Sequence, residues 1–216
     1  MTQHLTPRPY QHLLLDHLLG HARCAAWAGM GLGKTATTLL AIDTLDLVEP
    51  EPVLVLAPLR VARSTWPDEA GKWQQTQHID VVPICRTLAE RRAALRKSAK
   101  VFTTNYEQLP WLVEELGDRW PFRTVIADES TKLKGFRLRQ GGKRSRALAQ
   151  VAHKHVRRFV ELTGTPSPNG MLDLWGQAWF LDRGERLGRT FAAFRDRWFM
   201  STRIGNSPHA VRIDPL

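Results

Sequence analysis

The sequence predicts an α/β fold in which a parallel sheet is sandwiched between helices in three layers, α/β/α. Short apolar runs bounded by prolines, such as "PVLVLAP" at 52–58, are typical of strands buried on both faces. These runs alternate with helical stretches, as strands and crossover helices do in a parallel sheet. Glycines, acids and hydroxyl residues follow several of the runs, at the strand ends where such sheets place their chemistry.

The expected elements follow one another along the chain. Apolar runs predict strands at 24–28, 52–58, 78–85, 100–106, 123–130 and 156–166. Helical periodicity predicts helices at 10–21, 35–48, 61–73, 87–99 and 109–118, a basic loop and helix before the last strand, and an aromatic helical stretch at 171–199. The segment 201–216 has turn residues without periodicity and is interpreted as a connection. We therefore expect a domain over 1–180, followed by a helical extension and connection over 181–216.

The charge of the chain favours a polyanionic partner. Its 216 residues carry a formal net charge of +10. Ten basic residues and no acid occur between Ser130 and Val160. Such a run is either a solvated helix face or a surface that contacts a phosphate backbone. No apolar run has membrane-spanning length and the N-terminus lacks a signal-peptide core, so we expect no membrane partner. The expected location is the cytoplasm of a bacterium or phage-infected cell, or the nucleus in a eukaryote.

The stretch "AWAGMGLGKTATTLL" at 26–40 predicts a phosphate-binding loop. The pattern G-x-x-x-x-G-K-[ST] is matched from Ala28, which replaces the first glycine, to Thr35. Glycines let backbone N–H groups turn toward phosphate oxygens, and the helix that follows adds the positive end of its dipole. Lys34 is expected to pair with the β- and γ-phosphates, and Thr35 to bind Mg²⁺. We therefore expect ATP and Mg²⁺ as cofactors, bound by Gly29, Gly31, Gly33, Lys34 and Thr35.

Two acids follow the apolar run of "TVIADES". A P-loop ATPase needs an acid at the end of a neighbouring strand to hold the metal, and usually a second acid that activates water. Adjacent carboxylates at a strand end can instead cap the next helix. Because a P-loop is present in the same chain, we favour catalytic roles for Asp128 and Glu129, with Asp128 as a metal ligand.

Six stretches together resemble one family of ATPases. They are "RPYQ", "AGMGLGKT", "VLAPLRVARSTWPDEAGKW", "TTNYEQL", "IADESTKLK" and "LTGTPSPNG". Their order and spacing resemble the superfamily 2 helicase-like ATPases, and most of all the Swi2/Snf2-related branch, which includes helicase-like proteins of phages. The forms "GMGLGKT" and "LTGTPxxN" are specific to that branch, and the resemblance runs from about Pro7 to Phe199. It implies that this chain is the N-terminal RecA-like lobe of such an enzyme.

The resemblance also implies roles for single residues. Gln11 matches the glutamine that reads adenine, and Lys34, Asp128 and Glu129 match the catalytic lysine and acids. The motif that couples nucleotide state to nucleic-acid contact is matched by Thr163, Gly164 and Thr165. The segment from Pro58 through Trp66 and the loop 103–105 match places that touch a phosphate backbone, and the basic run adds further candidates. The expected nucleic-acid contacts are Arg60, Ser64, Thr104, Asn105, Lys132, Lys134 and Arg144.

One position departs from the family pattern. The family commonly has His or Asp two positions after the second acid, and Thr131 stands there in this sequence. A hydroxyl can still form a hydrogen bond toward the coupling motif, but it cannot titrate as imidazole does. The departure concerns the coupling between nucleotide and nucleic acid and leaves the ATP-binding residues untouched.

A second departure concerns the whole enzyme. Family members bind ATP between two lobes, and arginines of the second lobe stabilise charge on the phosphoryl group. The 216 residues hold no second α/β unit of that size. We therefore expect the ATP-binding lobe of a DNA-dependent ATPase or translocase, acting on duplex DNA, with weak or no hydrolysis until a second lobe completes it. The alternative is a non-catalytic module that binds nucleic acid or a partner protein.

Overall fold

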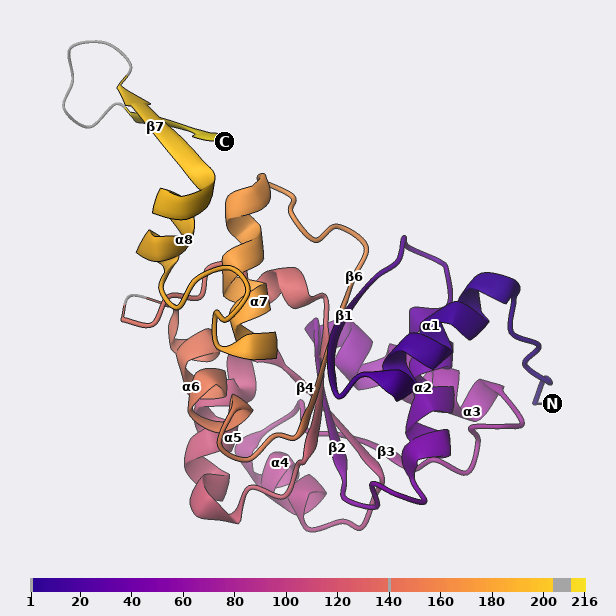
Figure 1. Cartoon of the computed structure of the whole chain (residues 1–216). Coiled ribbons are helices and arrows are strands. Elements are labelled where there is room, and N and C mark those ends of the chain that lie inside the picture. The colour runs from indigo at the N-terminus through magenta and orange to yellow at the C-terminus, as the bar shows by residue number, and fades with distance from the viewer. Residues whose placement is uncertain (1, 140, 204–210) are drawn as a thin grey trace.

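A six-stranded parallel sheet forms the centre of the molecule (Figure 1). The computed structural model describes residues 2–139, 141–203 and 211–216. The strands are ordered β1-β6-β5-β2-β4-β3, and every neighbouring pair is parallel. They are β1 (Arg23–Trp27), β2 (Val53–Ala57), β3 (Val81–Pro83), β4 (Val101–Asn105), β5 (Thr124–Asp128) and β6 (Arg158–Thr163).

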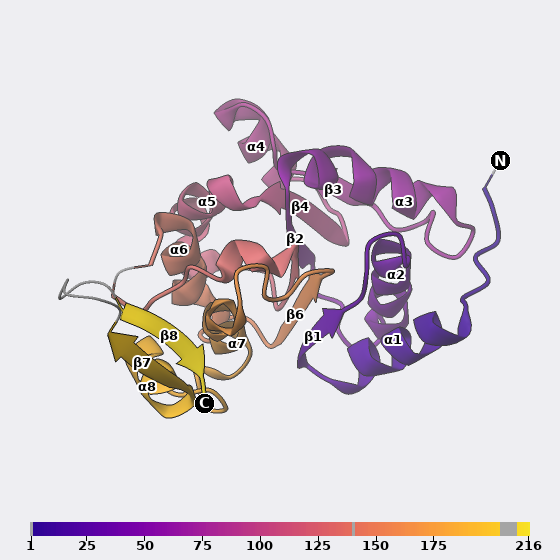
Figure 2. The ribbon, with the colours of Figure 1, turned by 90° about the horizontal axis from the view of Figure 1, so that it is seen from above.

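Helices cover both faces of this sheet (Figure 2). One face carries α1 (Pro9–Gly20), α2 (Lys34–Leu45) and α3 (Trp66–Lys72). The other carries α4 (Leu88–Leu95), α5 (Leu109–Leu116), α6 (Lys143–Ala152) and α7 (Leu174–Asp182). The predicted three-layer α/β/α class is confirmed.

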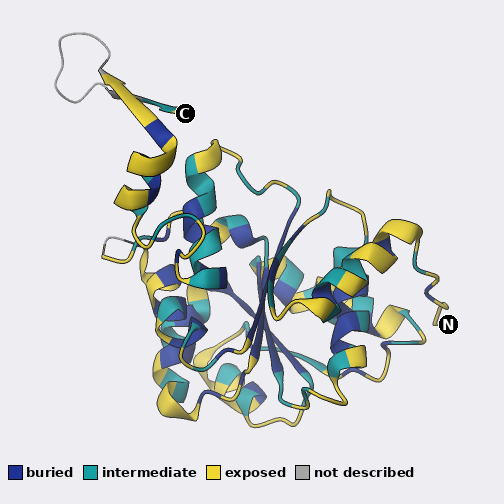
Figure 3. Ribbon diagram, viewed as in Figure 1, coloured by how far each residue is buried: buried dark blue, intermediate teal, exposed yellow. Residues whose placement is uncertain are grey.

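The burial pattern explains why the apolar runs form the inner strands. Every residue of β2 and β4 is buried, as expected of strands with helices on both faces (Figure 3). The sheet separates two apolar cores. One contains Leu39 and Trp66 from α2 and α3, and the other contains Leu148 and Trp175 from α6 and α7. Within the described residues, no helix combines the length and the apolar character needed to cross a bilayer.

Two predicted segments differ in the structure. The helix expected over 61–73 starts with a π-helical turn, Val61–Thr65, before α3. The segment interpreted as an aperiodic connection contributes to a two-stranded antiparallel sheet of β7 (Phe199–Arg203) and β8 (Val211–Pro215), which follows α8 (Phe191–Trp198). Figure 1 shows this hairpin projecting away from the main sheet. Regular strands therefore lie where no periodicity was expected, and 204–210 lie outside the described residues.

Candidate functional site

Three neighbouring strands deliver the predicted site residues to one edge of the sheet. β1 leads into the glycine loop, β5 ends at Asp128, and β6 ends at Thr163. Since β6 lies between β1 and β5, its register pairs Thr163 with Trp27 and Leu162 with Asp128. The loops that follow these strands are therefore adjacent, at the carboxyl ends where parallel sheets bind ligands.

The glycine loop has the backbone geometry that its sequence predicts. Gly31 and Gly33 have φ angles of 76° and 75°, in the left-handed region that favours glycine. Gly33 caps the N-terminus of α2, so the first amides of this 12-residue helix face the loop. The Lys34 ammonium donates to the carbonyls of Ala28 (2.6 Å) and Gly29 (2.8 Å). The lysine is thus held across the concave side of the loop.

Gln11 lies against this loop from α1. Its side chain is buried, and its amide donates to the Leu32 carbonyl at 3.3 Å. Its Oε1 accepts from the Arg8 amide at 2.8 Å, which closes the start of α1. A β-carbon on Gly33 would fall 2.2 Å from the Gln11 amide nitrogen, so the Gln11 side chain lies directly against this glycine. The structure brings Gln11 to the nucleotide edge, and its reading of adenine stays a prediction.

Asp128 is held by two aromatic donors that the sequence interpretation did not include. The Trp66 indole N–H donates to its Oδ2 at 3.0 Å, and the Tyr106 hydroxyl donates to its backbone carbonyl at 2.9 Å. Burial raises the pKa of the Asp128 carboxyl above its ordinary value. The Trp66 hydrogen bond and the Lys34 charge oppose that rise, and the neighbouring Glu129 adds to it.

Glu129 sits in a strained backbone conformation beside two threonines. Its φ of 59° is left-handed, which is uncommon for a residue with a β-carbon and often marks a functional site. Its Oε1 accepts from the hydroxyls of Thr131 (2.9 Å) and, at longer range, Thr163 (3.5 Å). The Thr131 hydroxyl thus reaches Glu129, and Glu129 connects it to Thr163 of the expected coupling motif.

The expected coupling motif packs between Glu129 and the glycine loop. The Thr165 amide donates to the Thr163 hydroxyl at 3.1 Å, which fixes the turn after β6. A β-carbon on Gly164 would lie 3.4 Å from the Ala28 carbonyl and 3.5 Å from the Met30 amide nitrogen. This motif therefore contacts the loop directly. The structure brings all three of its residues to the site.

The residues at this edge fit a magnesium nucleotide. Left-handed glycines, the N-terminus of α2 and Lys34 offer donors to phosphate oxygens, and the Thr35 hydroxyl and Asp128 carboxylate are oxygen ligands of the kind Mg²⁺ prefers. The described part of the chain contains no group of three or more His, Cys, Asp and Glu arranged to hold a metal. An ion here would therefore take its other ligands from phosphate and water.

A basic groove lies beside this site, at the ends of β2 and β3. It has a volume of about 520 Å³ and is lined by Leu59, Arg60, Arg63, Ser64, Pro83 and Arg86. Arg60 and Ser64 were expected contacts, and Arg63 and Arg86 were missed. Arg63 lies one turn from Arg60 within 58–66, so the sequence carried a signal for it. Only the tertiary fold brings Arg86 to the groove.

Two expected nucleic-acid contacts lie inside the protein. Thr104 is fully buried and donates its hydroxyl to the Ile84 carbonyl at 2.9 Å. Asn105 is also buried, and its amide donates to Glu107 at 2.7 Å. Their strand, β4, is covered on both faces. The prediction of surface contacts by these two side chains is therefore corrected.

The basic run between Ser130 and Val160 does not form one surface. Lys132 is exposed, Lys134 pairs with Asp173 at 3.4 Å, and Arg144 forms an ion pair with Glu107. Arg158 is buried at the opposite edge of the sheet, at the start of β6. The run therefore divides between the two edges and forms neither a single solvated helix face nor a single phosphate-contact surface.

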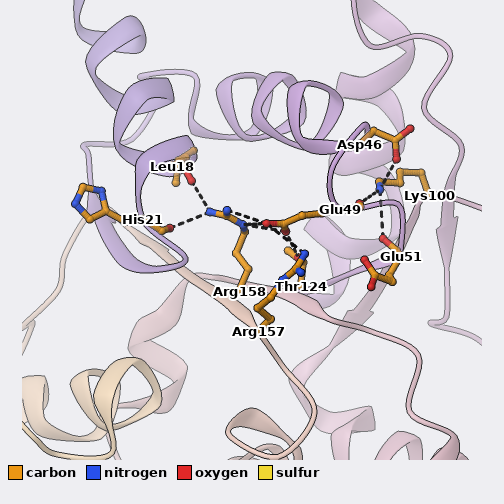
Figure 4. A network of polar contacts seen from close by, with 9 residues as sticks. All are labelled: Leu18, His21, Asp46, Glu49, Glu51, Lys100, Thr124, Arg157 and Arg158. Carbon is orange, nitrogen blue, oxygen red and sulfur yellow. Dashed lines mark hydrogen bonds and ion pairs between the residues drawn. The ribbon is translucent and has the colours of Figure 1, made fainter.

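Arg158 belongs to an internal ion-pair network (Figure 4). Its guanidinium donates to Glu49 at 3.0 Å and to the Leu18 carbonyl at 2.7 Å. Burial raises the pKa of the Glu49 carboxyl, but Arg158, with help from Arg157 and Thr124, outweighs that effect and leaves this pKa lowered. These charges hold α1 and the segment before β2 against the sheet, so their role is structural.

A glycine loop at a strand–helix junction, beside acids at the end of a nearby strand, defines a P-loop protein of the α/β class. The family model of the SNF2-related domain matches residues 27–200. The chain therefore belongs to the SNF2-related family, whose members include helicases and ATPases.

Relatives in sequence are longer than this chain. Protein p41 of Acyrthosiphon pisum secondary endosymbiont phage 1 is 60% identical over 214 residues, which are 98% of this chain and 46% of p41. Helicase swr1 of Aspergillus fumigatus is 29% identical over 211 residues, which are 90% of this chain and 12% of the helicase. The chain thus spans less than half the length of these relatives.

Solved structures share the fold. The Sulfolobus solfataricus SWI2/SNF2 ATPase core in complex with dsDNA matches with a TM-score of 0.74 and 24% identity, over 90% of this chain and 39% of the core. The UvsW helicase from bacteriophage T4 matches with a TM-score of 0.61 and 12% identity, over 84% of this chain and 61% of that helicase chain. These matches bear out the RecA-like three-layer fold.

Proposed function

We propose that this chain is the ATP-binding lobe of a DNA-dependent ATPase that moves on duplex DNA when a second lobe completes it. The observation that carries the proposal is the single cluster formed by the glycine loop, Asp128, Glu129 and Thr163. Membership of the SNF2-related family supports the same activity.

Each residue has a defined task in this proposal. Bound Mg²⁺ would supply positive charge that neutralises the phosphates. Lys34 would donate to phosphate oxygens in place of the carbonyls of Ala28 and Gly29, and Thr35 and Asp128 would hold the metal. Glu129 orients the attacking water. The hydroxyls of Thr131 and Thr163 donate to Oε1 of Glu129. No described residue donates to Oε2 of Glu129, so Oε2 can accept a hydrogen bond from water.

Duplex DNA is proposed as the partner from charge and from a structural neighbour. The archaeal ATPase core with the same fold was solved with dsDNA. In this chain the groove of Arg60, Arg63 and Arg86 opens at the same sheet edge as the nucleotide site. Guanidinium groups recognise phosphates well because their donors match the phosphate oxygens. The greater length of the relatives supports a second lobe as a further partner.

The test is ATP hydrolysis by the 216-residue chain with and without duplex DNA, beside Lys34→Ala. We expect weak, Lys34-dependent turnover that rises with DNA, and a loss on the order of 100-fold in the variant, because a charge-stabilising donor is removed. Turnover that survives Lys34→Ala would contradict the assigned site. Salt-sensitive DNA binding without turnover or nucleotide binding would instead favour the non-catalytic module.

A further inference from the structure

Asp128 is the point where two buried aromatic side chains meet. Trp66 is 0% exposed and donates its only polar hydrogen to the Asp128 carboxylate at 3.0 Å. Tyr106 is 2% exposed and donates to the backbone carbonyl of the same residue at 2.9 Å. Burial, with the Asp128 charge adding to it, raises the pKa of the Tyr106 hydroxyl, which therefore stays a donor.

Trp66 is attached directly to the basic groove. The π-helical turn that carries Arg63 ends at Thr65, and Trp66 is the next residue. The Trp66 amide donates to the Val61 carbonyl, so the turn and the indole share one hydrogen-bonded unit. Isolated π-helical turns are found frequently at functional sites. The indole thus connects the groove with the expected metal ligand.

The packing around Trp66 couples movement of the π-helical turn to the indole hydrogen bond with Asp128. Its ring lies in the apolar core formed with α2 and the sheet, together with Ala62 of the turn. The Thr103 hydroxyl of β4 donates to the Ala62 carbonyl and holds the turn against the sheet. An enclosed ring in a close-packed core cannot swing independently of its backbone. Movement of the turn therefore changes the distance or angle of the indole hydrogen bond.

We propose that Trp66 is a positioning residue that orients the Asp128 carboxylate toward Mg²⁺. We propose further that it transmits to this carboxylate the movement of the π-helical turn when Arg60 and Arg63 of the basic groove bind a phosphate. The inference rests on the proposed function and adds a regulatory path to that site. An indole N–H can only donate, so it holds one carboxylate oxygen and leaves the other for the metal side. Hydrogen bonds to a metal-binding carboxylate fix its orientation, and their loss typically weakens metal binding or activity about 10- to 100-fold.

The first experiment measures the Mg²⁺ dependence of nucleotide binding in the full chain. Trp66→Phe removes the N–H and keeps an aromatic ring, and Trp73→Phe is the matched control because its indole donates to Glu69 near the end of α3. We expect the Mg²⁺ concentration for half-maximal binding of an ATP analogue to rise about tenfold in Trp66→Phe and to stay unchanged in Trp73→Phe. Stimulation of hydrolysis by DNA should fall in Trp66→Phe.

The second experiment starts from the wild-type chain, so its main result does not depend on how a variant folds. The indole N–H resonance of Trp66 is followed by NMR during addition of the magnesium nucleotide and, separately, of duplex DNA. We expect both additions to shift it, and Arg60→Ser with Arg63→Ser to abolish the response to DNA. A resonance unmoved by either addition overturns the inference.

The outcomes separate the inference from the function on which it rests. A wild-type chain that binds no magnesium nucleotide overturns the proposed function and this inference with it. A wild-type chain that binds normally, beside a Trp66→Phe chain with the same Mg²⁺ dependence, overturns this inference alone.

Discussion

Glu161 is a buried carboxyl whose protonation makes the stability of the fold depend on pH. It lies in β6 with 1% of its surface exposed, and its Oε1 has no hydrogen-bond partner among the described residues. Burial, to which the charge of Asp182 adds, raises the pKa of the Glu161 carboxyl to about 8. The side chain is therefore protonated at neutral pH in the folded protein, whereas it ionises near pH 4.5 when the chain unfolds.

The first residue-scale prediction concerns this carboxyl. Because the folded state holds the proton more tightly, its contribution to stability is complete below pH 4.5 and is lost as the pH rises toward 8. Glu161→Gln removes this titration and keeps the shape. We expect the free energy of unfolding of the wild type to fall, relative to Glu161→Gln, by up to about 1.4 kcal/mol per pH unit in that window. Urea unfolding at pH 5, 6, 7 and 8 measures it, and parallel pH profiles for the two chains would contradict it.

The residues of the site differ in how far the sequence could predict them. Gly31, Gly33 and Lys34 could be predicted because they are neighbours in sequence, and one turn with the start of one helix determines their geometry. Trp66 and Tyr106 reach Asp128 across 62 and 22 residues of sequence. No local pattern distinguishes an aromatic residue that donates to an acid from one that only fills the core. Such contacts depend on which strands become neighbours.

At the scale of elements, α7 holds the loops that follow β5 and β6. Gln177 accepts from the Ser130 hydroxyl at 2.8 Å and donates to the Pro166 carbonyl at 2.7 Å. A β-carbon on Gly176 would lie 2.5 Å from the Leu133 carbonyl oxygen and 2.6 Å from that of Lys134. The helix can approach the segment after Glu129 this closely only because Gly176 has no side chain.

Gly176→Ala should therefore separate α7 from the segment after Glu129. The added methyl meets backbone atoms that cannot rotate away, and overpacking of this kind costs roughly 1–3 kcal/mol of stability. Gly71→Ala is the control, because nothing lies within 4 Å of a β-carbon there and an alanine favours the helix. Denaturant unfolding of both variants tests this. Equal stability of Gly176→Ala and wild type would contradict the prediction, because it would show that the segment after Glu129 moves aside with no loss of folding free energy.

Elements inside the sheet were easier to predict than those outside it. The run "VLVLA" of β2 is buried on both faces, so its composition alone indicates a strand. β7 contains the exposed Met200, Ser201 and Thr202, and has no continuous apolar run. The π-helical turn was missed because its one extra residue per turn changes the helical periodicity only locally.

For the whole molecule, the two edges of the sheet carry positive charge in different ways. At the carboxyl edge, Arg60, Arg63 and Arg86 line an open groove. At the amino edge, Arg158 is buried against Glu49, and Lys100 pairs with Asp46 (Figure 4). Net charge alone could not distinguish these arrangements, although it indicated a polyanionic partner. Neutralised charges contribute little to long-range attraction, so Arg158 and Lys100 add little to it.

DNA binding by the whole chain should follow this asymmetry. We expect affinity for a duplex to fall steeply with salt, and the double change Arg60→Ser with Arg63→Ser to reduce the slope of log K against log salt by about 2, since each lost phosphate contact lowers it by about 1. Arg157→Ser, an exposed arginine at the amino edge, is the matched control and should leave the slope unchanged. Fluorescence anisotropy between 50 and 200 mM salt, the range in which such contacts weaken binding, measures this. A slope lowered equally by Arg157→Ser would contradict the assignment of the DNA face.

The strand order also determines when the nucleotide site can form. β1 occupies the end of the sheet, and its neighbour β6 lies far along the chain, with Arg23 paired to Phe159. During synthesis the P-loop strand is made early, but its partner in the sheet does not yet exist. Bringing such distant segments together costs loop entropy, which slows folding. Because β6 lies between β1 and β5, we expect the P-loop and Asp128 to come together only after β6, the last strand of the main sheet along the chain, has paired with both neighbours.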